Sequence, residues 1–465
     1  MTAPSARVPV VRESAERSLA VTAVAGRDEV WICRVPAEEI MADADRIDDA
    51  LGSGHDLPLA GLTFAVKDNI DVAGMATTAG CPAFAYTAEA DAPAVRSLRE
   101  AGALFVGKTN LDQFATGLVG TRSPFGAVRS AVDPARVSGG SSSGSAVAVA
   151  LGEADLALGT DTAGSGRVPA AFNGIVGLKA TRGLVSTAGV VPACRSFDCV
   201  SVFAADVQLA ERAMVELTGP RGDAPRRRVF PADSPLGPPS RPVVARASDD
   251  DIGLLAPGWL EAYSAAADRL AAAGCDLVEI DLDPFFAAGR LLYEGAFVAE
   301  RYAALGAFIE AHANEVDPTV AQIIGAAGCI GAGAYVRDTE RLTKLAGQAA
   351  AAWRRCGAHS LLLPTTTRHP TLDEVARDPV GVNADLGRFT TFVNLLDMCA
   401  VAVPAGAVAG LPFGVSCIGP AFSDLVQLDI ARRVEGNRIP APATWAEGRR
   451  GRLSPPGVLL AVAGA

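Results

Sequence analysis

The sequence has little histidine and no cysteine arrangement of the kind that binds metal ions. Only four histidines occur in 465 residues, and the nine cysteines include no C-x-x-C pair. Because zinc sites need closely spaced Cys or His ligands, we expect no metal and no other cofactor. An odd number of scattered cysteines is typical of reduced, mostly buried thiols, which indicates a cytoplasmic protein.

Excess positive charge and long apolar segments are also absent. The net charge of −11 argues against a general nucleic-acid surface. No apolar run approaches the ~20 residues that span a bilayer. The N-terminal segment carries charges where a signal peptide needs an apolar stretch. We therefore expect a soluble protein that binds neither nucleic acid nor membranes.

From residue 62 onward, short apolar segments alternate with alanine-rich ones. This alternation predicts an α/β core with a largely parallel or mixed sheet. The predicted strands are residues 62–66, 103–107, 154–159, 277–282, 361–364, 401–404 and 413–419. One helix is expected to start after a cap at Asp206 and to run to Leu217. Another is expected to end near Gly274 and to bury Trp259, Tyr263, Ala266 and Leu270.

We interpret the chain as one α/β domain with a lead-in. Residues 1–55 are polar and predicted to be mainly helical, and residues 56–465 form the domain. Residues 218–242 are rich in Pro, Gly and Arg, as a linker or a surface excursion would be. Because strand-like and helix-like segments follow directly, we favour a surface excursion within one domain.

Two motifs match known signatures but lack the required context. Residues 102–109 match the P-loop pattern, yet the residues that would curl around a phosphate read as an apolar strand. Residues 140–144 match G-x-S-x-G, but no strand precedes them and no histidine lies late in the chain. Neither nucleotide binding nor an α/β-hydrolase elbow is predicted.

Three polar residues remain in apolar or glycine-rich settings: Lys67, Ser141 and Ser165. Each has an ordinary explanation by itself, as a solvated strand end, a helix cap and a turn. A serine hydroxyl becomes a nucleophile only when a base takes its proton.

Several longer segments resemble those of the amidase signature family. They are residues 64–80, 102–117, 139–183, 394–406 and 411–424, and the spacings of Lys67, Ser141 and Ser165 agree with the family layout. The resemblance implies a large mixed sheet flanked by helices on both faces. It also implies that Ser165 attacks the substrate carbonyl, Ser141 relays the proton and Lys67 is the base, with a cis peptide bond between Gly140 and Ser141.

An oxyanion hole is implied as well. The resemblance assigns it to the backbone amides of Thr162, Ala163, Gly164 and Ser165, with Ala163 at a place where glycine is common in the family.

A lysine base must be neutral, although the free side chain has a pKa near ~10.4. Burial disfavours the ammonium, and the apolar strand before Lys67 is consistent with such burial. The neighbouring Asp68 would oppose the shift if it shared the same face. Alternation along a strand sends it to the other face.

Three segments, residues 189–204, 291–305 and 386–406, resemble allophanate hydrolases within the family. That resemblance implies that Tyr293 and Arg301, eight residues apart, bind the substrate carboxylate. A guanidinium offers a bidentate fork to a carboxylate, and a tyrosine hydroxyl can add a third bond. The alternative is that Arg301 is a surface arginine beside Glu294 and Glu300. The implied reaction is hydrolysis of the terminal amide of allophanate through an acyl-enzyme.

Other functions and partners stay open. The chain could act on another small amide such as malonamate or a biuret-like compound, or be a subunit of a transamidating or urea-handling complex that is inactive alone. We expect a homodimer through the lead-in. The family's allophanate hydrolases often carry a C-terminal domain that helps the first product lose carbon dioxide. If that domain is absent, a decarboxylating partner is expected.

Overall fold

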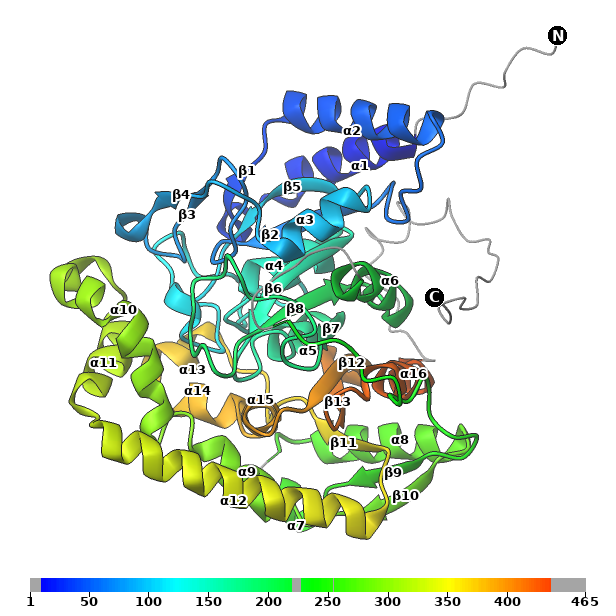
Figure 1. Ribbon diagram of the computed structural model, residues 1–465, viewed down its shortest axis with the longest axis vertical. Coiled ribbons are helices and arrows are strands. Elements are labelled where there is room, and N and C mark those ends of the chain that lie inside the picture. Colours follow the sequence, from blue (N-terminus) through cyan, green and yellow to red (C-terminus); the bar gives the residue numbers. More distant parts are fainter. Residues whose placement is uncertain (1–9, 220–226, 254, 436–465) are drawn as a thin grey trace.

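The computed structural model describes residues 10–219, 227–253 and 255–435, which contain an eleven-stranded mixed sheet (Figure 1). The strand order is β1-β5-β2-β6-β8-β7-β12-β13-β11-β9-β10. Strands β5, β2 and β6 are parallel, as are β11, β9 and β10, and the other neighbours are antiparallel. The predicted α/β class with a mixed sheet is confirmed.

The strands of this sheet are β1 (Trp31–Arg34), β2 (Thr63–Lys67), β5 (Leu104–Thr109), β6 (Leu156–Asp161), β7 (Val176–Lys179), β8 (Cys199–Ala204), β9 (Val243–Arg246), β10 (Asp276–Glu279), β11 (Ser360–Pro364), β12 (Cys399–Val408) and β13 (Leu411–Gly419). A separate ribbon pairs β3 (Ala76–Thr77) with β4 (Tyr86–Thr87). The helices are α1 (Val10–Ala25), α2 (Ala37–Gly52), α3 (Pro93–Glu100), α4 (Ser143–Leu151), α5 (Val168–Asn173), α6 (Val207–Thr218), α7 (Asp249–Ile252), α8 (Trp259–Ala272), α9 (Asp283–Arg290), α10 (Ala299–Ala311), α11 (Pro318–Ala326), α12 (Ala332–Cys356), α13 (Leu372–Arg377), α14 (Gly381–Leu386), α15 (Thr391–Leu395) and α16 (Asp424–Glu435).

All seven predicted strands are present, as β2, β5, β6, β10, β11, β12 and β13, whereas β1, β7, β8 and β9 were not predicted. Asp206 caps α6 by accepting a hydrogen bond from Leu209 N at 2.8 Å. The predicted apolar stripe of α8 is buried, and Gly274 follows the helix with φ of +86°. The segment that matches the P-loop pattern forms the fully buried strand β5, as expected.

Helices cover both faces of the sheet. Neighbouring residues of a strand point to opposite faces, so one strand contributes side chains to the packing on each side. Phe64 and Val66 of β2 pack in one hydrophobic cluster with residues of α3 and α6. Ala65 of β2 and Ala157 of β6 pack in a second cluster with α4. The strands that carry the predicted site are thus buried on both sides.

The lead-in is not purely helical. Residues 10–55 form α1 and α2, but β1 lies between them and pairs antiparallel with β5, so this segment supplies an edge strand of the sheet. In Figure 1 the two helices lie side by side at the top of the molecule. The dimer contact assigned to this segment stays a prediction.

Residues 218–242 connect α6 to β9, a strand of the same sheet; of these, residues 220–226 lie outside the described residues. All nine cysteines are free. Within the described ranges, no single helix is both long and apolar enough to cross a bilayer, and one pair, Pro318–Cys329 with Ala332–Cys356, meets that test only jointly across a bend of 100°.

Candidate active site

Lys67, Ser141 and Ser165 come from three elements around one edge of the sheet. Lys67 is the last residue of β2, Ser141 lies just before α4, and Ser165 lies in the loop between β6 and α5. Because β2 and β6 are parallel neighbours, their carboxyl ends meet at the same edge. This edge brings together residues that are far apart in the sequence.

Lys67 is fully buried, and its amine nitrogen has two hydroxyl neighbours. Nζ lies 2.8 Å from Ser141 Oγ and 2.7 Å from Thr160 Oγ1. Burial lowers the pKa of Lys67 from 10.5 to about 7, against the opposing charges of Asp112, Asp161 and Asp198. The amine is therefore substantially neutral near pH 7 and can accept a proton from Ser141.

Asp68 does not share the environment of Lys67. Its carboxylate forms an ion pair of 2.9 Å with Lys108, and both side chains are fully buried. It also accepts hydrogen bonds from the backbone and hydroxyl of Thr78. Asp68 is not among the charges that act most strongly on Lys67. The expectation that it points to the other side of the strand is confirmed.

The peptide bond between Gly140 and Ser141 is cis, as the resemblance implied. The carbonyl of Ser141 accepts a hydrogen bond from Asp112 N at 3.1 Å. A side chain at Gly140 would lie 2.1 Å from Asp112 Oδ2, so only glycine fits this approach. The Asp112 carboxylate in turn accepts hydrogen bonds from the backbone amides of Val119, Gly120 and Arg122.

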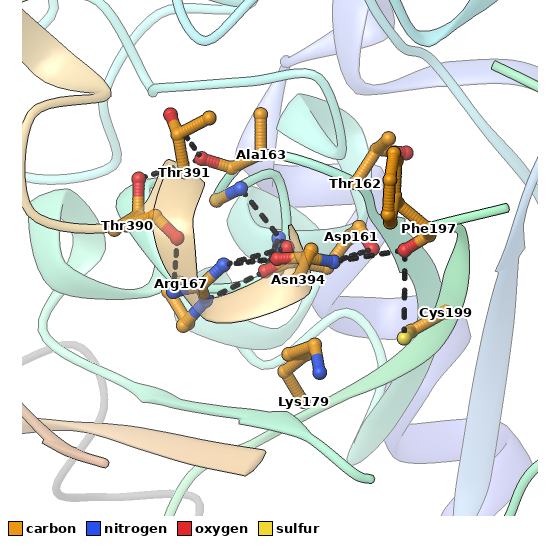
Figure 2. A network of polar contacts seen from close by, with 12 residues as sticks. Asp161, Thr162, Ala163, Arg167, Lys179, Phe197, Cys199, Thr390, Thr391 and Asn394 are labelled. Carbon is orange, nitrogen blue, oxygen red and sulfur yellow. Dashed lines mark hydrogen bonds and ion pairs between the residues drawn. The ribbon is translucent and has the colours of Figure 1, made fainter. Parts of the chain in front are cut away.

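The loop that carries Ser165 is held by a buried ion pair (Figure 2). Asp161 accepts two bonds from the Arg167 guanidinium, at 2.9 Å and 2.8 Å. The same carboxylate accepts hydrogen bonds from the backbone amides of Gly164 and Gly166, on either side of Ser165. Asn394, which lies 227 residues beyond Arg167, bonds both the guanidinium and the carbonyl of Asp161. Ser165 is therefore fixed by a network that crosses from β6 to α15.

These contacts change the expected oxyanion hole. The Gly164 amide donates to Asp161 Oδ1 at 2.9 Å, so the prediction that it donates to the oxyanion is wrong. The amides of Thr162, Ala163 and Ser165 stay predicted donors. Ala163 is not among the described residues with positive φ, so the backbone there tolerates a side chain.

Ser165 is 4% exposed. Among the described residues, no hydrogen bond joins Ser165 Oγ to Ser141 Oγ. The hydrogen bond between Ser141 and Lys67 that the predicted relay needs is thus present, and the step from Ser165 to Ser141 stays a prediction.

Tyr293 and Arg301 lie together. Arg301 Nη2 donates to Tyr293 Oη at 3.2 Å, and the guanidinium lies 5.6 Å from the centre of the tyrosine ring. Arg301 is 1% exposed, so the alternative of a surface arginine is wrong. Its Nη1 donates to Thr116 Oγ1 at 2.8 Å, and its Nε is buried without a partner. Arg301 also helps to lower the pKa of Lys67 by charge repulsion.

Beside this pair lies a cavity of about 440 Å³. Its walls include Thr116, Arg122 and Tyr293, and otherwise mostly apolar residues of α11, α14 and the segment around Val298. Thr391 also lines it and places a hydroxyl 3.4 Å from the carbonyl of Ala163, which links the cavity to the Ser165 loop. Lys67, Ser141, Ser165 and Arg301 do not themselves line this cavity, which reaches them through Thr116, Tyr293 and Thr391.

The residues that position the site were not predicted from the sequence. Asp161 and Arg167 stand on either side of Ser165 in the sequence, and their opposite charges were a usable signal. No signal in the sequence indicated Asp112, Thr116 or Asn394, because their roles depend on contacts with distant segments. Within the described residues, no group of three or more His, Cys, Asp or Glu is placed to hold a metal ion.

The activity is expected to rise with pH and to level off near neutrality. Lys67 can act as a base only when it is neutral, and its pKa is lowered to about 7. The value of kcat/KM should therefore fall about tenfold per pH unit below that pKa and stay flat above it. Initial rates of ammonia release between pH 5 and 9 measure this. A flat profile in protein that stays folded at pH 5 would contradict a lysine base.

A mixed sheet with a buried lysine next to a serine on a cis peptide bond, and a second serine in a glycine-rich loop, defines an amidase-type hydrolase fold. The chain belongs to the amidase family: the family model described as Amidase matches residues 18–427.

The chain is similar to family members of more than one kind. The chain is 44% identical over 418 residues to a urea amidolyase of Lachancea kluyveri, covering 88% of this chain and 22% of that protein. It thus spans less than a quarter of that relative's length. The structure of Kluyveromyces lactis allophanate hydrolase is 40% identical, with a TM-score of 0.84 over 94% of this chain and 71% of that one. A glutamyl-tRNA(Gln) amidotransferase subunit of Symbiobacterium thermophilum is 37% identical and covers 90% of this chain and 92% of that protein.

Proposed function

We propose that this protein hydrolyses the terminal amide of allophanate and releases ammonia through an acyl-enzyme on Ser165. The observation that carries the proposal is Arg301, a buried guanidinium without an acidic partner among the described residues, beside the hydroxyl of Tyr293. A buried cation of this kind suits a substrate carboxylate, and allophanate carries one next to its amide. The likeness to allophanate hydrolase and urea amidolyase supports the same substrate.

In the proposed reaction, Ser165 Oγ attacks the terminal amide carbon. Its proton passes to Ser141 Oγ, while the proton of Ser141 passes to Lys67 Nζ, 2.8 Å away. The amides of Thr162, Ala163 and Ser165 stabilise the oxyanion. When the C–N bond breaks, a proton returns by the same route to the leaving nitrogen, and ammonia departs. Water then attacks the ester, so that one water is consumed and an N-carboxylated carbamate is formed.

A second function is favoured by the 37% identity to the glutamyl-tRNA(Gln) amidotransferase subunit. Under it, the chain would act within a complex and be inactive alone. A panel of allophanate, malonamate, biuret and glutamine, read out as ammonia from the purified chain, distinguishes the two. Ammonia from allophanate supports our proposal. Ammonia from none of these substrates would contradict it and favour the complex.

Replacing Arg301 with alanine is expected to raise KM for allophanate at least ~10-fold, because a charge-assisted bond to a carboxylate contributes ~1.5–3 kcal/mol. The kcat/KM for a neutral amide should change much less. Steady-state ammonia release on both substrates measures this. Equal losses on the two substrates would refute a carboxylate clamp.

A further inference from the structure

Another buried arginine, Arg122, lines the cavity and is not used by the proposed reaction. It is 3% exposed and lines the cavity next to Thr116 and Tyr293. Its Nη1 donates to the carbonyl of Thr116 at 2.9 Å, and its Nη2 donates to the carbonyl of Pro379 at 2.5 Å. Its Nε is buried without a partner. Its guanidinium bonds only neutral carbonyls and forms no ion pair within the described residues, while its backbone amide donates to the buried carboxylate of Asp112 at 3.0 Å.

Arg122 and Arg301 are joined through one residue. Thr116 accepts from Arg122 with its carbonyl and from Arg301 with its hydroxyl, at 2.9 Å and 2.8 Å. Thr116 is fully buried, and its hydroxyl also donates to the carbonyl of Phe114. The position of the Arg301 fork therefore depends on a threonine that Arg122 holds in place.

Arg122 lines the cavity and Arg301 bonds its wall residues Thr116 and Tyr293, so two buried guanidinium groups lie close to one cavity and favour an anion there. Among the described residues, neither has a carboxylate within 4.0 Å; Glu294 also lines the cavity but is exposed and pairs with neither. Removing an ion from water has an effective penalty of several kcal/mol, and like charges add to it. A neutral donor such as glutamine could bond the carbonyls of Thr116 and Pro379 without that penalty.

We propose that Arg122 is a specificity-determining residue of this cavity: it positions Arg301 through Thr116, and its charge makes the cavity select amides that carry a carboxylate. The inference rests on the proposed function and deepens it. Arg301 holds the carboxylate, and the positive charge of Arg122 adds an attraction that an anionic amide gains and a neutral amide does not. Both the planar donor geometry of the Arg122 guanidinium and its positive charge contribute to this selectivity.

The test uses malonamate and malonamide, which are of similar size and differ in one charge. In Arg122→Gln, the ratio of kcat/KM for malonamate to that for malonamide should fall at least ~10-fold, mainly through KM for the anion. Arg122→Lys, which restores the charge but not the fork, should recover part of that ratio. Thr116→Val removes the hydroxyl but leaves the carbonyl, and should give an intermediate loss.

Arg269→Gln is the matched control. Arg269 is half-buried, donates like Arg122 to a carbonyl (that of Ala405, at 2.7 Å) and has an unpartnered Nε, but it does not line the cavity. Its substitution should leave the ratio within about twofold, the scatter expected away from a binding site. If Arg122→Gln does not fold, the kcat/KM ratios of Arg122→Lys and Thr116→Val test the proposal instead. The shift in thermal midpoint caused by malonamate, compared with that caused by malonamide, tests the same preference without turnover.

Three outcomes separate this inference from the proposed function. An unchanged ratio in folded Arg122→Gln, or equal losses on both amides, would overturn the role of Arg122 and leave a purely structural one. If Arg301→Ala abolishes the preference for malonamate and Arg122→Gln leaves it unchanged, the role of Arg122 is overturned and the proposed function is not. A preference that both variants reduce, in a protein that does not hydrolyse allophanate, supports the inference and overturns only the substrate assignment.

Discussion

Replacing Ser165 with alanine is expected to lower ammonia release by at least ~10⁴-fold, as loss of a nucleophile does in other serine hydrolases. The alanine removes the only protein atom that forms a covalent bond with the substrate in the proposed reaction. The fold should persist, since the Ser165 loop is held by the backbone amides of Gly164 and Gly166 on Asp161 rather than by the Ser165 hydroxyl. Ammonia release, circular dichroism and thermal unfolding measure the two effects.

Ser145→Ala is the control for this variant. Ser145 is also buried, lies in α4 four residues after Ser141, and bonds Thr109 and the carbonyl of Leu158 rather than Lys67. It should lose stability by roughly 1 kcal/mol, the contribution of a typical hydrogen bond, while turnover changes little. Activity retained in Ser165→Ala would show that another residue is the nucleophile.

Lys67→Met is expected to lower kcat by ~10³–10⁵-fold, because it removes the proposed base and leaves both serines without a proton acceptor. Methionine has a similar length and no charge, and the buried amine of Lys67 is itself substantially neutral near pH 7. The protein should therefore fold with a similar thermal midpoint. Ammonia release across the pH range should also lose its dependence on a group that titrates near 7.

Lys67→Arg separates a base from a positive charge. Arginine cannot lose its proton in a protein, so it keeps a cation near Ser141 but cannot act as a base. The two substitutions should be similarly inactive. If arginine restored activity to within tenfold of the unmodified protein, Lys67 would act through its charge and the proton relay would be wrong.

Much of the core could be predicted from the sequence because strands buried on both faces appear as continuous apolar runs. This held for β2, β5 and β6, which carry or support the site. The strand β1 was missed because it is only four residues long, lies between two helices and pairs with β5, which is far away in the sequence. Its place in the sheet follows from pairing that no local pattern encodes.

For the candidate site, the sequence likewise predicted some residues and missed or misassigned others. Lys67, Ser141 and Ser165 were found because each stands in a distinctive segment that resembles the family. Gly164 was misassigned because the sequence does not indicate that Asp161 folds back onto its amide. The homodimer and the cytoplasmic location stay predictions.

The sequence by itself determined the α/β class, the residues available for the chemistry and the family. The tertiary structure decided how those residues behave. The pKa of Lys67 and the burial of Arg301 depend on every atom packed around them, from segments as distant as Thr160 and Thr116. Desolvation and charge act through space rather than along the chain, so only the folded protein sets whether an amine is a base and whether an arginine is a receptor for an anion.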